Sequence, residues 1–197
     1  MADAGEIASL IRNLYLDDPA KRAVAAGEIF ALGSAVARAA AREWLAYTPL
    51  ARLFVHDASG VLEATVGIAL EPNTFERIRS ANGSPRLADV PPDQDAKEFE
   101  LDFPSGVRLD ILTTREAGGA GAIARYLLKF GEGIQQVEIS ATDVDGATEI
   151  LRGRFALEPV YPATRAGADG TRINFFLVPK ADGGKVLIEL VESAAKS

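Results

Sequence analysis

The pattern that most constrains the fold of this chain is an apolar strand that carries one carboxylate and occurs twice. One copy is VLIELVE (186–192), and the other is GVRLDILTT (106–114). Because side chains alternate between the two faces of a strand, Glu189 shares its face with Leu187 and Val191. An ionised carboxylate in such a strand has to be paired, neutralised, bound to a cation or used chemically.

Each of these strands ends a similar series of elements. The first series has a strand at 64–70, a helix at about 74–81 and strands at 98–103 and 106–114. The second has a helix at about 120–130, a strand at 135–141, a helix at 144–155 and strands near 159–162, 171–179 and 185–191. We therefore predict an α+β protein with two tandem β-α-β-β-β repeats, at about 61–115 and 120–193.

The first 58 residues have the apolar spacing and the alanine content of helices. We expect Gly33-Ser34 to divide the alanine-rich part into two helices. A cluster of turn residues at 57–60 makes a boundary with the strand-rich part that follows. The predicted organisation is a helical region, 1–58, followed by a module, 61–193, that contains both repeats.

Composition excludes several classes of function. The net charge is -7 with no long cluster of Lys or Arg, so nucleic acid is not an expected partner. Cysteine is absent, which excludes disulfides and thiolate chemistry. The acidic, helix-patterned start does not resemble a signal peptide, and no apolar run approaches about 18 residues, so we expect a cytoplasmic protein without a membrane partner. The one histidine, His56, is expected to be structural or exposed.

Several short motifs carry a family resemblance. They are the turn Gly131-Glu-Gly133, the helix start Thr142-Asp-Val144, the string Gly170-Thr-Arg172 and the pair Gly183-Gly184 before VLIELVE. With these motifs, residues 130–192 resemble the C-terminal half of methylmalonyl-CoA epimerases. These enzymes belong to the vicinal oxygen chelate superfamily, together with glyoxalase I, extradiol dioxygenases and bleomycin-resistance proteins. The resemblance covers about 61–193 and implies that the two modules form a cup-shaped mixed sheet around a divalent metal.

The resemblance also assigns positions for the site. Thr65, in TVGIAL, and Gln136, in GIQQVEIS, stand where the family has its two metal-binding histidines. Asp110 stands where the family has Glu or Gln, and Glu189 matches the family's ligand in kind. Asp93, in a PDQ string, aligns with the Glu that epimerases use as catalytic base in a PEQ string.

These replacements change the expected metal chemistry. Imidazole suits zinc, cobalt and iron, whereas the side chains present here offer oxygen. We therefore expect no transition metal and no other cofactor. A site for a hard cation such as Mg, Ca or Mn on Asp110, Gln136 and Glu189 is left open.

Strand alternation adds further residues to the expected cup. Arg108 lies on the face of Asp110, and Glu138 and Ser140 lie on the face of Gln136. One interpretation is an ion-pair network around Arg108 that fills the cup. In the other, the clustered acids raise one another's pKa, so that one of them shuttles a proton near neutral pH.

The sequence leaves open whether the protein is an enzyme. The first hypothesis is proton transfer on a small carbonyl or acyl-thioester substrate, by an isomerase, epimerase or lyase of the glyoxalase class. Its catalytic residues would be Glu189, Asp110 and Asp93. Substrate contacts would come from Arg108 and Gln136, which would position an oxyanion, and from Glu138, Thr65 and Ser140.

Two alternatives to this hypothesis stay open. In one, a non-catalytic protein uses the same cup to bind a small molecule. In the other, the N-terminal helices dock a partner through an exposed apolar stripe that includes Trp44. In each case a homodimer is expected, because the superfamily is often dimeric.

Overall fold

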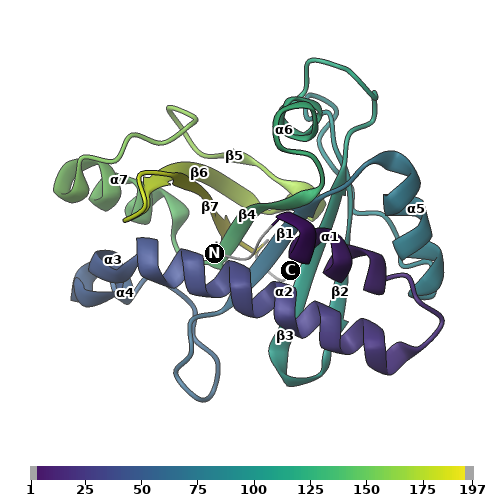
Figure 1. The fold of residues 1–197 in the computed structure, drawn as a ribbon. Coiled ribbons are helices and arrows are strands. Elements are labelled where there is room, and N and C mark those ends of the chain that lie inside the picture. The colour runs from purple at the N-terminus through teal and green to yellow at the C-terminus, as the bar shows by residue number, and fades with distance from the viewer. Residues whose placement is uncertain (1–3, 194–197) are drawn as a thin grey trace. The chain divides into compact units, whose positions relative to one another are not determined.

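The computed structural model describes residues 4–193, which form two compact units. The first unit contains the residues up to Gly33 together with Thr65–Gln135. The second contains Ser34–Ala64 and the residues from Gln136 on. Each unit therefore combines part of the N-terminal helical segment with one series of strands (Figure 1).

The sheet of the first unit is mixed. Its third strand, β3, pairs in parallel with β1 and antiparallel with β2, which gives the order β2-β3-β1. The helices of this unit are α1, α5, α6 and the first part of α2. The bounds are α1 (Ala4–Asn13), α2 (Pro19–Ala40), β1 (Ala64–Ala69), α5 (Pro72–Ala81), β2 (Lys97–Phe103), β3 (Val107–Thr113) and α6 (Ala122–Phe130).

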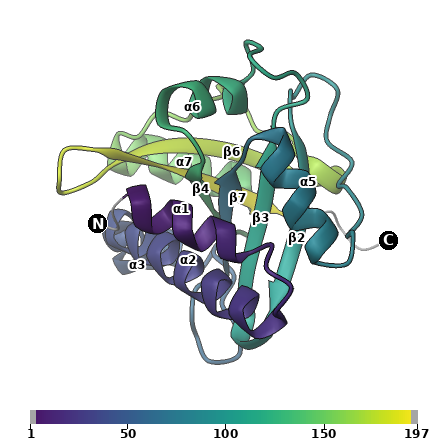
Figure 2. The same cartoon turned by 45° about the vertical axis from the view of Figure 1, so that its right-hand side comes forward.

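One face of this sheet is apolar and packs against α5 (Figure 2). The rings of Phe75 in α5 and Phe99 in β2 meet edge to face, with their centroids 4.8 Å apart. Register places Phe99 beside Ile111 of β3, which lies beside Ile68 of β1. Alternation then turns the polar residues of the same strands to the opposite face.

The second unit has the same order of pairing. Its last strand, β7, pairs in parallel with β4 and antiparallel with β6, and β6 pairs with β5. The order is β4-β7-β6-β5. The bounds are α3 (Arg42–Ala46), α4 (Thr48–Ala51), β4 (Gly133–Ser140), α7 (Val144–Phe155), β5 (Arg165–Ala166), β6 (Arg172–Pro179) and β7 (Lys185–Glu192).

The core of the second unit includes residues from the helical segment. Trp44 is only 2% exposed and meets Phe176 of β6 edge to face, with a centroid distance of 6.2 Å. Leu50 and Phe54 belong to the same cluster, together with apolar residues of β4, β7 and α7. The alternative of partner docking through an exposed apolar stripe that includes Trp44 is therefore wrong for this residue, because the indole packs inside this unit.

The predicted α+β class with a mixed sheet and an N-terminal helical segment is confirmed. The strand predicted near 159–162 is wrong, since this segment makes one isolated bridge, between Pro159 and Phe176. Prolines at 159 and 162 cannot donate to a ladder of hydrogen bonds. The proposed boundaries of the two repeats stay predictions.

Gly33 does not divide the helical segment, contrary to the sequence-based expectation. The α2 helix runs without a break from Pro19 to Ala40. A Cβ atom on Gly33 would lie 2.6 and 2.8 Å from the two methyl carbons of Val66 in β1. Glycine is therefore needed here because the helix approaches the strand closely.

The α2 helix is also long and apolar enough to cross a membrane, and no other helix in residues 4–193 passes this test. The test rests on length and composition alone, and the core helix of a soluble protein passes it as well. Buried side chains on this helix include Ala25, Ala26 and Ile29. The expected lack of a membrane partner stays a prediction.

Gly33→Ala is expected to lower the free energy of unfolding by about 1–3 kcal/mol, because the added methyl group overlaps the fully buried Val66. Gly27→Ala is the matched control. It changes the same helix at a point where a Cβ meets nothing within 4 Å, so better helix propensity should stabilise it by up to about 1 kcal/mol. Urea unfolding measures both variants. Equal stabilisation by the two would contradict this close packing.

Candidate functional site

Three polar side chains meet on one face of the second unit's sheet. Glu138 of β4 and Glu189 of β7 are register partners. The Gln136 side-chain amide donates to the Glu189 carboxylate, with Nε2 and Oε2 2.5 Å apart, and reaches Glu138 Oε1 at 3.4 Å. Gln136 and Glu189 are each only 6% exposed, and Glu138 is half-buried. The structure thus brings together three of the residues predicted for the site.

This cluster follows from strand alternation. The residues between these positions, Val137 and Ile139 in β4 and Ile188 and Leu190 in β7, are fully buried, and all but Val137 belong to the core cluster of this unit. Glu138 and Glu189 must then point to the opposite face. Ser140 lies further along the same face of β4, where its backbone forms hydrogen bonds with the backbone of Val55 and Glu63. On the other side of β7, Phe175 of β6 is the second register partner of Glu189.

The amide of Gln136 suits two acids better than a histidine would in its neutral form. It has two N–H donors, and its contacts here are with the carboxylates of Glu138 and Glu189. Hydrogen bonds from a neutral amide stabilise a carboxylate without adding a titrating group. The arrangement can therefore hold two acids side by side at fixed positions.

A second group of predicted residues lies on one face of the first unit's sheet. Thr65 is 6% exposed and Asp110 is 5% exposed, and Arg108 is half-buried. Register places Asp110 between Gly67 of β1 and Glu100 of β2. This face therefore has carboxylates on two neighbouring strands.

Arg108 has acidic neighbours on the same face of that sheet. Its register partner is Asp102 of β2, and Asp110 follows two positions further along its own strand. Acidic residues at these two positions favour the interpretation in which Arg108 forms an ion-pair network that fills the cup. Both interpretations of this residue stay predictions.

Asp93 lies in an exposed loop before β2. The loop turns at Pro91, where the Gln94 amide donates to the Pro91 carbonyl at 3.0 Å. Asp93 is therefore placed by this loop rather than by a strand.

A clamp that sequence reasoning missed fixes this loop. Asp95 accepts hydrogen bonds from the Thr114 hydroxyl at 2.7 Å and from the Arg115 amide at 3.0 Å. The Arg115 side chain donates back to the carbonyls of Ala96, at 2.8 Å, and Val90, at 3.0 Å. These contacts cannot be predicted from the periodicity of strands and helices, because all the residues involved lie outside regular elements. The only available signal was the Thr-Arg pair directly after the strand that carries Asp110.

His56 was expected to be structural or exposed, and the structure shows it exposed. Its Nδ1 lies 3.1 Å from the carbonyl of Phe54. No group of three or more His, Asp or Glu side chains in residues 4–193 is arranged to hold a metal. The donor chemistry of the second unit also does not fit a metal. Gln136 turns its NH2 group, which cannot coordinate a cation, toward Glu189. The hard-cation site left open on Asp110, Gln136 and Glu189 stays a prediction.

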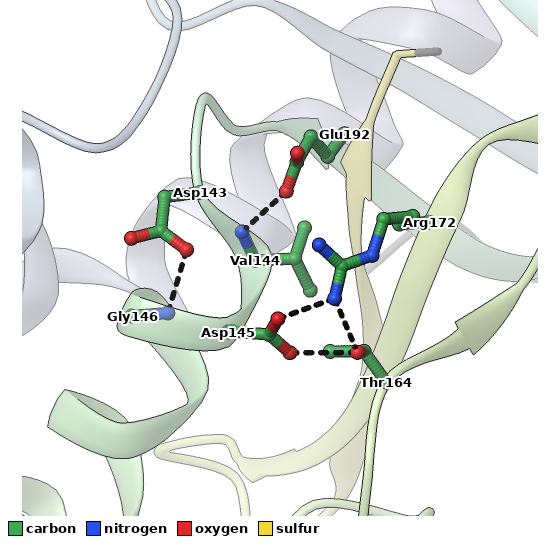
Figure 3. A network of polar contacts seen from close by, with 7 residues as sticks. All are labelled: Asp143, Val144, Asp145, Gly146, Thr164, Arg172 and Glu192. Carbon is green, nitrogen blue, oxygen red and sulfur yellow. Dashed lines mark hydrogen bonds and ion pairs between the residues drawn. The ribbon is translucent and has the colours of Figure 1, made fainter. Parts of the chain in front are cut away.

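A polar network fixes the end of β7, three residues beyond Glu189 (Figure 3). Glu192 accepts a hydrogen bond from the first amide of α7, on Val144, at 3.0 Å, and Asp143 caps this helix through the amide of Gly146 at 2.8 Å. Asp145 contacts the Thr164 hydroxyl at 2.6 Å and pairs with Arg172. The network joins α7 to the strand that carries Glu189.

The Thr164 hydroxyl and the Arg172 guanidinium hold the pKa of Asp145 below its ordinary value. A lowered pKa stabilises the fold above the pKa of an unfolded Asp, about 4, and this stabilisation is lost as the pH falls through the lowered value. Asp145→Asn should therefore be less stable than the wild type at pH 7, and the difference should shrink below about pH 4. Because Asp145 is exposed, the effect is small. Thermal unfolding from pH 7 to 3 measures it, with the exposed Asp17→Asn as control. A difference that stays constant with pH would contradict the pairing.

No family model and no curated protein matches the chain. Solved structures do match it. Methylmalonyl-CoA epimerase from Mycobacterium tuberculosis is 34% identical, with a TM-score of 0.54, and the match covers 66% of this chain and 86% of that one. A Streptomyces coelicolor methylmalonyl-CoA epimerase variant in complex with 2-nitronate-propionyl-CoA is 28% identical, with a TM-score of 0.53 and coverage of 68% and 98%. A methylmalonyl-CoA epimerase in complex with methylmalonyl-CoA and NH4+ is also 28% identical, with a TM-score of 0.53 and coverage of 73% and 96%.

The predicted resemblance is thus confirmed by whole-domain similarity. The match to the mycobacterial enzyme combines identity above 30% with coverage of most of that enzyme. It agrees with the two series of strands and with the motifs that lead into VLIELVE. The chain belongs to the methylmalonyl-CoA epimerase family of the vicinal oxygen chelate superfamily.

Proposed function

We propose that this protein is an isomerase that moves a proton at the carbon next to the carbonyl of a small acyl thioester, with methylmalonyl-CoA or a close relative as substrate. The observation that carries the proposal is the buried Glu189, held by Gln136 beside a second carboxylate, Glu138. Two related epimerases, in complex with methylmalonyl-CoA and with 2-nitronate-propionyl-CoA, support the substrate class.

The reaction requires a base, an acid and a group that stabilises an enolate. The base removes the proton from the α-carbon, and the electron pair moves onto the thioester carbonyl oxygen. A proton then returns to the other face of the same carbon, and the electron pair moves back. The neighbouring carboxyl groups of Glu138 and Glu189, which are register partners, are proposed to accept and return this proton.

The roles of the residues follow from this scheme. Glu189 is the proposed acid/base group, with Glu138 as its neighbour in the substrate site. Asp110 and Asp93, both in the first unit, stay proposed acid/base residues on the ground of their sequence positions. Arg108 and Gln136 stay proposed residues for positioning the oxyanion, on the ground of their sequence positions. Thr65 and Ser140 are proposed to contact the substrate.

Solvent exchange tests the activity directly. The protein is incubated in D2O with methylmalonyl-CoA, propionyl-CoA and acetyl-CoA, and mass spectrometry follows the gain of one mass unit per exchanged α-proton. We expect exchange into methylmalonyl-CoA well above the rate without protein. Exchange no faster than in buffer, with all three thioesters, would contradict the proposal.

The second candidate function is a non-catalytic binding protein, and one observation favours it. The 2.5 Å hydrogen bond from Gln136 already occupies one oxygen of Glu189. A carboxylate held in this way is a good fixed contact and a less available base. Calorimetry combined with the exchange assay separates the two functions, because a binding protein takes up the acyl thioester without exchanging its α-proton.

The expected surroundings of the protein are proposals as well. We expect a homodimer in the cytoplasm that has no nucleic-acid or membrane partner. Light scattering of the full chain measures the mass in solution and checks the dimer.

A further inference from the structure

Two aromatic rings and a guanidinium lie in a row beside Glu189. Phe175 of β6 is the register partner of Glu189, and its ring meets that of Tyr161 edge to face at 5.9 Å. The guanidinium carbon of Arg165 lies 4.5 Å from the centroid of the Tyr161 ring. The row therefore leads from the acid cluster to a positive charge, all within the second unit.

Register places this guanidinium on the same face of the sheet as the acids. Arg165 of β5 pairs with Ile173 of β6, which pairs with Val191 of β7, two residues from Glu189. With neighbouring strands about 4.8 Å apart and residues about 3.3 Å apart, the Cα atoms of Arg165 and Glu189 are separated by about 12 Å. Phe175, Tyr161 and Arg165 are each half-buried, so packing holds them while part of their surface is accessible.

The charges on this face determine what such a row can bind. Glu138 and Glu189 repel an anionic ligand, and the whole chain carries a net charge of -7. Acyl-CoA substrates are anionic through their phosphates, and a methylmalonyl group adds a carboxylate. A guanidinium binds both kinds of oxyanion through paired hydrogen bonds, and contact with an aromatic face holds it in place.

We infer that Arg165, stacked on Tyr161 and bordered by Phe175, forms a subsite that binds an anionic group of the acyl-thioester ligand. The inference rests on the proposed function for the substrate class. It assigns this row to ligand binding and orientation, so that the α-carbon lies near Glu189. The anion is a phosphate of the carrier or the carboxylate of the acyl group, and the choice of probes separates the two.

Calorimetry with three probes tests the subsite. Methylmalonyl-CoA carries phosphates and an acyl carboxylate, propionyl-CoA carries only phosphates, and methylmalonyl-pantetheine carries only the carboxylate. Arg165→Ala should raise Kd about tenfold or more for the probes that carry the recognised anion. If Arg165→Ala weakens the binding of the two CoA esters and not that of methylmalonyl-pantetheine, the recognised anion is a phosphate. If it weakens the binding of the two methylmalonyl probes and not that of propionyl-CoA, the anion is the carboxylate.

Two further variants control for charge and folding. Lys185→Ala removes an exposed cation from the same strand face, four residues from Glu189, and should leave Kd within about twofold. Arg165→Gln removes the charge but keeps an unbranched polar side chain, and it replaces Arg165→Ala if that variant unfolds. Equal weakening by Lys185→Ala, or unchanged binding of all three probes by the Arg165 variants, would overturn the inference.

The outcome is separable from that of the proposed function. Binding that depends on Arg165 without α-proton exchange by the wild type leaves the subsite in place and refutes catalysis. If the wild type exchanges the α-proton and the Arg165 variants bind unchanged, catalysis is supported and the subsite is refuted. A wild type that binds none of the three probes overturns both.

Discussion

Glu189→Gln is expected to slow α-proton exchange into methylmalonyl-CoA by about 10²–10⁴-fold, the usual contribution of a positioned acid/base group. Glutamine has nearly the same shape but cannot accept or return a proton. In the wild type the Gln136 amide donates to the Glu189 carboxylate at 2.5 Å, and in the variant it faces the new amide. Binding of the acyl thioester should change far less than the exchange rate, because the size of the side chain is kept.

Glu149→Gln is the matched control for this variant. Glu149 lies exposed on α7, and its replacement removes the same charge away from the cluster. Its exchange rate should stay within about twofold of the wild type, as surface substitutions usually do. Exchange by Glu189→Gln at the wild-type rate would show that Glu189 is a structural residue, as a buried carboxylate in an apolar strand also can be.

Trp44→Ala is expected to lower the free energy of unfolding by about 3–5 kcal/mol. The indole is 2% exposed, packs edge to face on Phe176, and belongs to a core cluster with Leu50. Removing it leaves a cavity between the helical segment and the sheet of the second unit. Chemical unfolding followed by circular dichroism measures the loss, since the variant no longer has a tryptophan signal.

Leu128→Ala is the control for Trp44→Ala, because Leu128 is 90% exposed and should change stability by less than about 0.5 kcal/mol. Trp44→Phe should fall between the two, because it keeps an aromatic ring against Phe176. If Trp44→Ala costs no more than Leu128→Ala, the helical segment is not part of this core.

The strands that carry Asp110 and Glu189 could be predicted because alternation and apolar content are local properties of the sequence. The continuity of α2 through Gly33 could not, since its cause is the distant Val66. The isolated bridge at Pro159 is the opposite case, because its cause is local: proline has no N–H to donate to a ladder of hydrogen bonds.

The cluster around Glu189 was predictable in its members but not in its contacts. Alternation puts Gln136 and Glu138 on one face of their strand, whereas their approach to Glu189 depends on the register between β4 and β7. Register between strands far apart in the chain is set by packing as a whole. The Asp95 clamp was missed for a related reason, because its hydrogen bonds join two irregular loops.

The most direct test of the central claim, proton transfer at an acyl thioester, follows a single epimer of methylmalonyl-CoA in D2O by proton NMR with catalytic amounts of the full chain. The signal of the α-proton should disappear while the chirality of the α-carbon is lost, and Glu189→Gln should slow both changes by about 10²–10⁴-fold. If the α-proton signal is lost no faster than without protein, although the ligand is shown to be bound, the claim is contradicted and the protein is a binder of acyl thioesters.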